Sequence, residues 1–287
     1  MRRVVVTGAN KGIGLAIAAA ILAEHTDTVV FLGSRSEDRG QAAREGLIAS
    51  HPDRADRIEV LQLDVTSNDS VRRAVEQVAD RGPLYGVVNN AGIAAGDMQT
   101  VLAVNTFGVR RVCGAFLPLL QPSGRIVTVS SASGPSFVSG CSPKRRRTFV
   151  DPDIEWSTLE AIIAECLSIE GDEASFAARG LGSGKPYGLS KALVNAYTVL
   201  LARENPHLRI NACTPGFIET DLTRPFAATS GRSPAEMGMK SPGEGARSSM
   251  SLLFGELEGN GRFYGSDARR SPLDQYRSPG TPAYTGD

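Results

Sequence analysis

Tyr187 and Lys191, four residues apart, are the first candidates for chemistry in this sequence. They lie in a helix-forming run, Tyr187–Arg203, so both side chains project from one face of the helix. A phenol titrates near ~10, but an ammonium ion at hydrogen-bonding distance lowers that pKa by ~1 to 3 units. The pair can therefore donate or accept a proton. Surface pairs on ordinary helices share this spacing, so other motifs must decide between the two interpretations.

A serine and an asparagine extend the candidate set. Ser130 and Ser131 follow the strand-like run Arg125–Val129, at the carboxyl edge where ligands of α/β sheets bind. Asn105 lies within a helical stretch. Taken alone, either serine is compatible with a turn, and Asn105 with a polar residue that bends a helix.

Three glycines, Gly8, Gly12 and Gly14, lie between the strand-like Val4–Val6 and an alanine-rich helical stretch. The first allows a tight exit from the strand, the second lets the backbone approach a pyrophosphate, and the third lets the helix pack against the sheet. The helix N-terminus then offers unpaired N–H groups to an anion. A glycine-rich turn without a ligand is the alternative, but strand, spacing and helix together predict a dinucleotide site.

With these motifs the chain resembles the short-chain dehydrogenase/reductase family, over residues 1 to about 222. The motifs that carry the resemblance, after Thr-Gly-x-x-x-Gly-x-Gly at 7–14, are Asp64-Val65, Asn89-Asn90-Ala91-Gly92, Asn105, Ser130-Ser131, Tyr187-x-x-x-Lys191 and Pro215-Gly216. The resemblance implies that Tyr187 is the general acid, that Ser131 bonds the substrate carbonyl, and that Asn105 holds a water linked to Lys191. It also implies a cofactor site composed of Gly8, Asn10, Lys11, Gly12, Ile13, Gly14, Arg35, Arg39, Asp64, Val65, Asn90, Ala91, Gly92, Tyr187, Lys191, Pro215, Gly216, Ile218 and Thr220.

The residues after the second strand predict which nicotinamide cofactor is bound. An NAD enzyme places Asp or Glu there to bond the ribose 2′-hydroxyl. This chain has Ser34 and then Arg35, and a guanidinium pairs with a 2′-phosphate. Arg39 and Lys11 are expected to add positive charge, whereas Glu37 and Asp38 are expected in the first turn of the next helix, where acidic residues are normal. We therefore expect NADPH/NADP+ as the cofactor.

Alternating strand and helix patterns must position these residues. Strands are predicted at Arg3–Val6, Thr28–Leu32, Ile58–Leu63, Leu84–Val88, Arg125–Val129, His207–Ala212 and Arg262–Tyr264. Helices are predicted at Ile13–Glu24, Gly40–Ser50, Asp69–Asp80, Gln99–Leu120 and Tyr187–Arg203. This alternation predicts an α/β fold, a Rossmann-like doubly wound parallel sheet of about seven strands, within one domain spanning 1–287.

Two segments interrupt the alternation. Within the insertion 134–185, Ser157 and Glu160 match a capping box and predict a helix at about 157–169, with an apolar stripe of Leu159, Ile162, Ile163, Cys166 and Leu167. Such an insertion resembles the monomeric NADPH-dependent carbonyl reductase branch of the family, in which it covers the oligomerisation face, so a monomer is expected. The tail 271–287 is rich in Pro, Gly and Ser, which predicts irregular, loosely packed chain and a poor place for chemistry.

Composition excludes several functional classes. Lys plus Arg and Asp plus Glu number 31 each, so we expect neither a nucleic-acid nor a membrane-surface partner. The four cysteines lack paired spacing, which predicts reduced thiols and a cytoplasmic protein, and the three histidines form no metal-ligand pattern. The Lys144–Arg147 run is interpreted as a solvated face.

The predicted activity is NADPH-dependent reduction of a ketone or aldehyde, a small-molecule carbonyl substrate, by hydride transfer with Tyr187 as general acid. The alternatives are an alcohol dehydrogenase working in the oxidative direction and a non-catalytic NADP(H)-binding regulator. The regulator is prompted by the segment 93–104, which is shorter than in relatives and would impair the site if Asn105 fell out of register. The loop Arg224–Lys240 is predicted to be a substrate lid.

Overall fold

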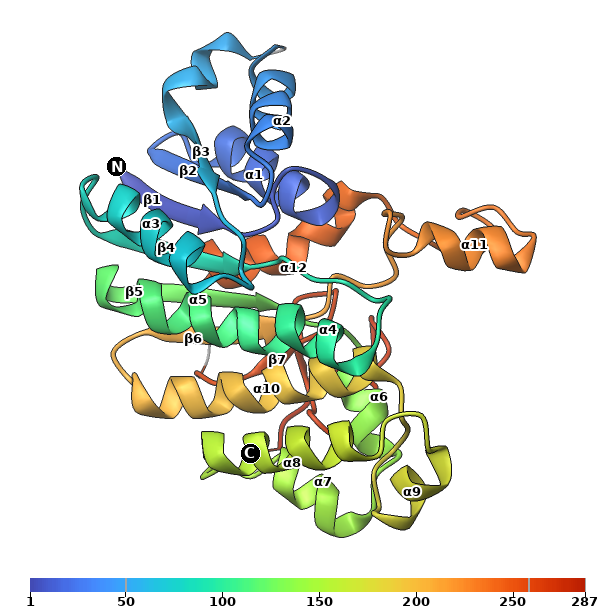
Figure 1. The fold of residues 1–287 in the computed structure, drawn as a ribbon. Helices are drawn as coiled ribbons and strands as arrows, with labels where there is room; N and C mark the ends of the chain where they lie inside the picture. The colour runs from blue at the N-terminus through green and yellow to red at the C-terminus, as the bar shows by residue number, and fades with distance from the viewer. Residues whose placement is uncertain (50, 258, 287) are drawn as a thin grey trace.

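The computed structural model describes residues 1–49, 51–257 and 259–286, and its centre is one twisted sheet (Figure 1). The strands are β1 (Arg2–Val6), β2 (Thr28–Ser34), β3 (Ile58–Gln62), β4 (Leu84–Asn89), β5 (Leu120–Val129), β6 (Arg209–Cys213), β7 (Phe263–Tyr264) and β8 (Arg270–Ser271). Their order is β3-β2-β1-β4-β5-β6-β7-β8, with β8 antiparallel to β7 and every other pair parallel. The predicted Rossmann-like sheet of about seven strands is confirmed, with a short antiparallel strand added at the edge.

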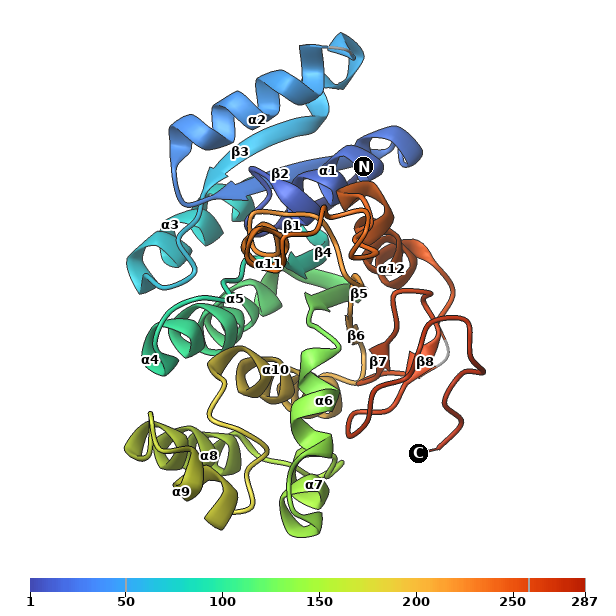
Figure 2. The same ribbon diagram turned by 90° about the vertical axis from the view of Figure 1, so that its right-hand side faces the viewer.

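Helices cover both faces of the sheet (Figure 2). On one face lie α1 (Gly12–Glu24), α2 (Glu37–Ala49) and α12 (Pro242–Phe254), packed on side chains such as Val6 and Val88. On the other lie α3 (Asn68–Ala79), α5 (Gly108–Phe116) and α10 (Pro186–Glu204). Buried apolar strands of this kind are what a parallel sheet covered on both sides requires. The predicted end of the second helix, Ser50, lies outside the described residues.

The predicted helix Gln99–Leu120 is confirmed as one helical stretch, which runs from Met98 to Leu119 but is not a uniform α-helix. The chain forms α4 (Met98–Leu102), a single π-helical segment (Ala103–Phe107), α5, and a 3₁₀ turn (Leu117–Leu119). Asn105 occupies the π segment with its side chain fully buried. A π-bulge widens the helix locally, and such bulges frequently lie at functional sites. A second 3₁₀ turn, Pro52–Arg57, precedes β3.

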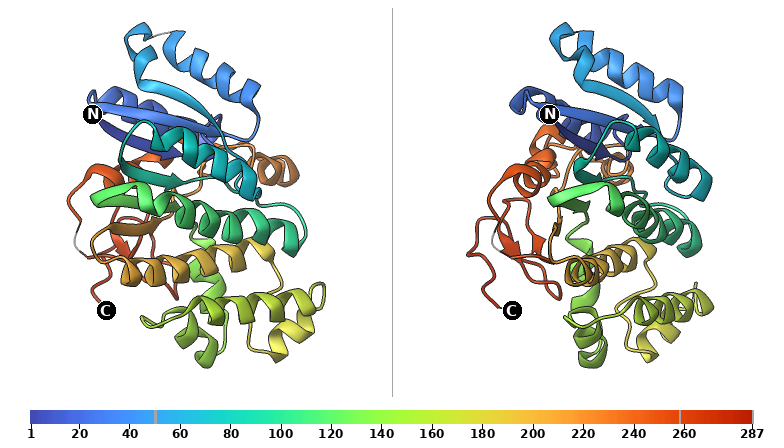
Figure 3. Two further views of the ribbon diagram at one scale, coloured as in Figure 1. Left: turned by 60° about the vertical axis from the view of Figure 1, so that its left-hand side comes forward. Right: turned by 90° about the vertical axis from the view of Figure 1, so that its left-hand side faces the viewer.

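The insertion contains four helices where we predicted one: α6 (Ser133–Ser139), α7 (Pro143–Phe149), α8 (Trp156–Ser168) and α9 (Glu173–Ala178). They lie at one end of the molecule, next to α10 (Figure 3, yellow-green). The helix predicted at 157–169 is confirmed as α8, but the capping box is wrong. Glu155 is the N-cap, and Ser157 lies inside the helix, with its Oγ donating to Glu155 Oε2 at 3.4 Å.

The apolar stripe of α8 is largely buried. Leu159, Ile162, Ile163 and Cys166 are at most 3% exposed, whereas Leu167 is 38% exposed and does not belong to the cover. The helix begins at Trp156, whose ring packs edge-on against Tyr197 of α10 at 5.6 Å. The N-cap of α8, Glu155, thus lies two residues before Ser157, the N-cap that the Ser-x-x-Glu pattern predicts.

Two C-terminal elements were not predicted as helices. The first, α11 (Arg224–Ser230), lies in the predicted lid and projects from the body (Figure 1). The second, α12, packs on α1. Its glycines and serines lower helix propensity, but an added Cβ at Gly245 would lie 2.8 Å from Ile218 Cγ1, so close packing requires glycine there. No helix in the described ranges is both long and apolar enough to cross a membrane.

Candidate active site

The glycine turn between β1 and α1 leaves no room for larger side chains. Gly8 has φ +62°, and a Cβ there would lie 2.9 Å from Ala91 Cα. A Cβ at Gly14 would lie 2.5 Å from the carbonyl oxygen of Gly8. The helix begins at Gly12 with Lys11 as a cap residue that makes no side-chain cap bond, so its first N–H groups face outward unpaired by a side chain. This is the cradle that a pyrophosphate requires.

Asn90 and Thr7 hold this turn in place. Thr7 Oγ1 accepts hydrogen bonds from the backbone N–H groups of Asn90 and Ala91, at 3.0 and 2.9 Å. Asn90 Nδ2 donates to the carbonyl oxygens of Thr7 and Gly8, at 2.9 and 3.1 Å. The predicted cofactor residue Asn90 thus shapes the glycine turn directly. Thr7 was missed as a site residue, although its place at the strand end immediately before Gly8 was the available signal.

The pocket predicted for a 2′-phosphate lies after β2. Ser34 is buried at the strand end, and the exposed Arg35 and Arg39 have no carboxylate partner in the portion of the chain that the structure describes. Glu37 lies in the first turn of α2, as predicted. Lys11, which we expected to add positive charge there, makes an ion pair with Asp221 Oδ2 at 2.6 Å.

The other predicted cofactor residues lie along the same edge. Asp64 Oδ1 accepts hydrogen bonds from the N–H and hydroxyl of Thr66, at 2.9 and 2.7 Å, which leaves its second oxygen available to a ligand. Val65 is 7% exposed. The loop after β6 approaches the glycine turn, since a Cβ at Gly12 would lie 3.5 Å from Thr220 Cγ2. The remaining predicted members of this edge are Asn10, Ile13, Gly92, Pro215, Gly216 and Ile218.

The predicted catalytic residues meet where β5 ends and α10 begins. The Ser131 hydroxyl acts on the Tyr187 phenol, lowering its pKa against the effect of burial. Lys191 is 6% exposed, its Nζ lies 5.5 Å from the centroid of the Tyr187 ring, and it donates to the carbonyl oxygen of Val129 at 3.0 Å. The structure therefore brings a hydroxyl, a phenol and an ammonium to the carboxyl edge of the sheet.

Asn105 belongs to the same cluster, because its side chain reaches both the segment after Gly92 and the start of α10. Its Oδ1 accepts from the N–H of Ile93 at 2.9 Å, and its Nδ2 donates to Ile93 O at 2.8 Å and to Ser190 Oγ at 3.0 Å. A Cβ at Gly92 would lie 3.2 Å from Asn105 Oδ1 and 3.7 Å from Lys191 Nζ, so these two groups face the same glycine. With the short segment 93–104, Asn105 still lies beside Gly92 and Ser190.

Burial sets the protonation of the two titrating groups. Burial raises the pKa of Tyr187 above its ordinary value of 10.0, against the opposing hydrogen bond from Ser131. The expectation that Lys191 lowers this pKa is therefore wrong for the protein without cofactor. Burial also lowers the pKa of Lys191 from 10.5 to about 8. At neutral pH the phenol keeps its proton and can act as an acid.

Replacing Lys191 by methionine is expected to stabilise the fold while removing the ammonium. The lowered pKa, 10.5 to about 8, means that the folded protein disfavours the charged form. At ~1.4 kcal/mol per pKa unit, keeping Lys191 charged in the folded state costs about 3 kcal/mol below pH 8. The variant avoids this cost but loses the hydrogen bond to Val129 O, which contributes about 1 kcal/mol. We expect Lys191→Met to raise the free energy of unfolding by about 2 kcal/mol at pH 7, measured by urea denaturation.

The pH dependence provides the control. Between the folded pKa of about 8 and the unfolded value of 10.5, the unfolded wild type binds the extra proton, so wild-type stability rises with pH and the advantage of Lys191→Met shrinks. An advantage that is equal at pH 7 and pH 10 contradicts the assignment to the buried charge.

A cavity of about 370 Å³ opens beside Ser131. Besides Ser131, its walls include Thr214 and Phe217, with Gly238 and Lys240 of the predicted lid segment. The tail also contributes to the walls, through Tyr276, Arg277 and Pro279. The tail after Ser271 is irregular and largely exposed, as predicted, but it also forms part of the cavity wall next to a catalytic candidate.

The cluster, the glycine cradle and the sheet together match one known protein class. Residues 2–142 match the family model for short chain dehydrogenases. Carbonyl reductase (NADPH) 1 of Mus musculus is 32% identical over 277 residues, 90% of this chain and 94% of the relative. The chain belongs to the short-chain dehydrogenase family.

Further comparisons extend this family assignment. Carbonyl reductase (NADPH) 3 of Rattus norvegicus is 34% identical to this short-chain dehydrogenase, over 78% of the chain and 84% of the relative. Among solved structures, salutaridine reductase from Papaver somniferum superposes with a TM-score of 0.77 at 26% identity, covering 92% of this chain and 99% of that one. The likeness thus extends well past residue 222, into the C-terminal part.

Within the described residues, the cysteines and acidic residues of this short-chain dehydrogenase form no second metal or disulfide centre. Cys113, Cys141, Cys166 and Cys213 are unpaired and buried. No group of three or more potential metal ligands occurs in the ranges that the structure describes. In the Lys144–Arg147 run, which we interpreted as a solvated face, Arg145 instead makes an ion pair with Glu165 at 2.6 Å and joins α7 to α8.

Proposed function

We propose that this short-chain dehydrogenase reduces ketones or aldehydes with NADPH, with Tyr187 as the general acid. The observation that carries the proposal is the cluster at the carboxyl edge of the sheet in which Asn105 and Lys191 are buried beside the half-buried Ser131 and Tyr187. The carbonyl reductases that it resembles bear NADPH in their names. A proton donor and a second hydroxyl at one point suit the reduction of a carbonyl oxygen.

The residues around the glycine turn fit NADPH. Gly8, Gly12 and Gly14 leave the space for a pyrophosphate, and Arg35 with Arg39 offers two unpaired guanidinium groups to the 2′-phosphate. A carboxylate at either position would repel that phosphate. When bound, NADPH supplies the hydride that the reaction needs.

The side chains of the cluster have distinct tasks. Ser131 hydrogen-bonds the carbonyl oxygen of the substrate, and Tyr187 gives its proton to the same oxygen as negative charge develops there. Lys191 keeps the local charge positive below its pKa of about 8. Asn105 holds the backbone of Ile93 and α10 so that Lys191 stays beside Gly92.

At neutral pH the Tyr187 phenol is in the protonated form that carbonyl reduction uses. Reduction needs a protonated phenol, whereas alcohol oxidation needs a phenolate to accept the proton. Since burial raises the pKa of Tyr187, the acid form dominates at neutral pH. We infer that the protein works as a reductase near neutrality and that oxidation requires alkaline conditions.

NADPH consumption with a panel of ketones, aldehydes and quinones tests the proposal. We expect turnover with NADPH on several members of the panel. Tight binding of NADPH with no turnover on any compound would overturn the reductase and favour a cofactor-binding regulator. The four reduced thiols lead us to propose the cytoplasm as the compartment.

We also propose that the protein is a monomer, because α8 covers the apolar face of α10. Leu159, Ile162 and Ile163 are buried in the same core as α10 residues. Burying apolar surface stabilises a fold by roughly 25 cal/mol per Å², so the buried stripe of α8 contributes several kcal/mol. Removal of α8 would expose an apolar surface that promotes association. Light scattering at micromolar concentration is expected to give the monomer mass of 30.3 kDa, and deletion of residues 140–180 to cause association. A stable wild-type dimer or tetramer contradicts this proposal.

A further inference from the structure

The C-terminal tail is fixed to the sheet edge although it contains little regular structure. After β8, the N–H of Tyr284 donates to the carbonyl oxygen of Arg270 at 2.9 Å, and the Arg270 guanidinium lies 5.2 Å from the centroid of the Tyr284 ring. The chain therefore returns along β8. Between these points it forms a loop that carries Tyr276, Arg277 and Pro279.

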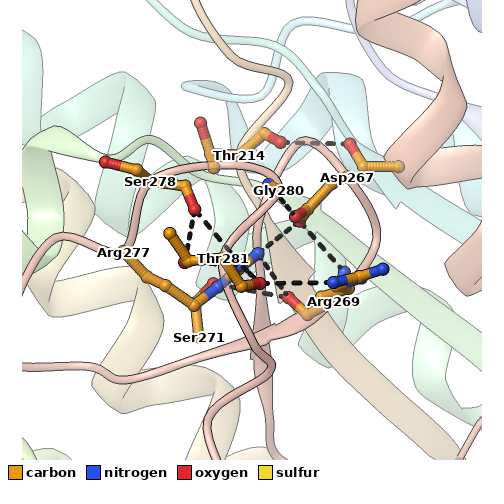
Figure 4. Close-up of polar contacts among 9 residues, drawn as sticks. Thr214, Asp267, Arg269, Ser271, Arg277, Ser278, Gly280 and Thr281 are labelled. Atoms are coloured by element: carbon orange, nitrogen blue, oxygen red, sulfur yellow. Dashed lines mark hydrogen bonds and ion pairs between the residues drawn. The ribbon is translucent and has the colours of Figure 1, made fainter.

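The Arg277 side chain holds this loop together. It is 8% exposed and makes an ion pair with Asp267, whose side chain is 19% exposed. Its Nε donates to Ser271 Oγ at 2.9 Å and its Nη1 to Thr281 O at 2.8 Å (Figure 4). Asp267 also accepts the N–H of Gly280 at 2.9 Å. The guanidinium and carboxylate thus join both ends of the loop to the turn before β8.

Gly265 has no side chain and therefore leaves space for the ion pair between Asp267 and Arg277. An added Cβ at Gly265 would lie 2.5 Å from Arg277 Nη2 and 2.6 Å from Asp267 Oδ1. Burial opposes the ionisation of Asp267, but the Gly280 N–H and the Arg277 guanidinium outweigh burial and hold its pKa below 3.8. A paired, largely buried charge of this kind is costly to break, since removing one partner leaves the other uncompensated.

The same loop forms one side of the cavity beside Ser131. Tyr276, Arg277 and Pro279 line it together with Phe217 and Ser131. The guanidinium donors of Arg277 are engaged within the protein, so Arg277 contributes no free charge to a substrate there. The volume of about 370 Å³ is near the lower end of ~300–1,000 Å³ for ligand sites, so a wall in this place restricts what can enter.

We propose that residues 276–279 form a wall of the substrate cleft that limits the size of the carbonyl compound, and that Arg277 is the positioning residue of this wall. The inference rests on the proposed reductase function. In this proposal the aromatic ring of Tyr276 selects small ketones over large ones. The ion pair between Arg277 and Asp267 holds that ring in place.

The test compares two ketones that differ in one group, acetophenone and benzophenone. Tyr276 is 54% exposed, so Tyr276→Ala removes the ring with little effect on folding. We expect the ratio of kcat/KM for benzophenone to that for acetophenone to rise at least tenfold in Tyr276→Ala. Tyr276→Phe, which keeps the ring, is expected to retain the wild-type ratio. A ratio in Tyr276→Ala that stays within twofold of wild type, or falls, overturns the wall.

A second measurement tests the positioning role without any turnover. The peptide bond after Arg277 is a trypsin site, and in the wild type the buried ion pair protects it. Asp267→Asn is expected to release the peptide 278–287 at least tenfold faster and to raise the benzophenone ratio, whereas Asp69→Asn, which alters an exposed ion pair with Arg72, leaves both unchanged. Equal release from Asp267→Asn and wild type overturns the role of Arg277. If wild type reduces neither ketone nor any panel compound, the proposed function fails instead.

Discussion

Tyr187→Phe is expected to lower kcat/KM for carbonyl reduction by at least ~100-fold, because a positioned general acid contributes ~10²–10⁴ in rate. The substitution removes one oxygen and keeps the ring that packs at the start of α10. Ser131 then remains the single hydroxyl of the pair that can bond the substrate oxygen. The measurement is NADPH consumption under saturating cofactor, with cofactor binding followed separately by fluorescence.

The matched control is Tyr197→Phe, the same change on the same helix. Tyr197 is 6% exposed and packs against Trp156, away from the cluster. This variant is expected to keep wild-type turnover, and both variants are expected to bind NADPH normally. If Tyr187→Phe and the wild type behave alike on every active compound, Tyr187 is not the acid.

Arg35→Asp is expected to weaken NADPH binding by about 100-fold, equivalent to ~2.7 kcal/mol, because a charge-assisted bond is lost and a repulsive carboxylate is added. NADH, which lacks the 2′-phosphate, is expected to bind at least as well as to the wild type. The dissociation constants of the two cofactors, measured by fluorescence titration, give the change in preference directly.

The control for this prediction is Arg73→Asp, which makes the same charge change at an exposed position on α3. It reports the effect of net charge alone and is expected to change both dissociation constants by less than threefold. Equal losses for NADPH and NADH in Arg35→Asp would show that the 2′-phosphate is recognised elsewhere.

The sheet was predictable because local patterns determine it, whereas the cluster was predictable only together with the family resemblance, which singles out Ser131 and Asn105. The glycine spacing at 8–14 and the pair Tyr187 and Lys191 each lie within one strand–helix unit, and parallel strands bring their carboxyl ends to one edge. The direction of the Tyr187 pKa shift was not predictable, because it depends on how deeply folding buries the phenol.

The features that sequence reasoning missed depend on tertiary contacts. The π segment around Asn105 has the same apolar periodicity as an ordinary helix, and its widening shows only in the hydrogen-bond pattern. The ion pair between Asp267 and Arg277 lies in a Pro- and Gly-rich stretch whose composition indicates loose chain. Periodicity contains no information about such a contact, because neither residue belongs to a helix or to a strand.

The burial of all four cysteines has a consequence for chemical durability. Burial raises the pKa of Cys113 and of Cys166 to about 12, and it also raises that of Cys141 and Cys213. Electrophilic aldehydes and quinones are attacked by thiolates and not by thiols. The proposed reductase would therefore offer such compounds no thiolate of its own, and we expect it to resist alkylation by them.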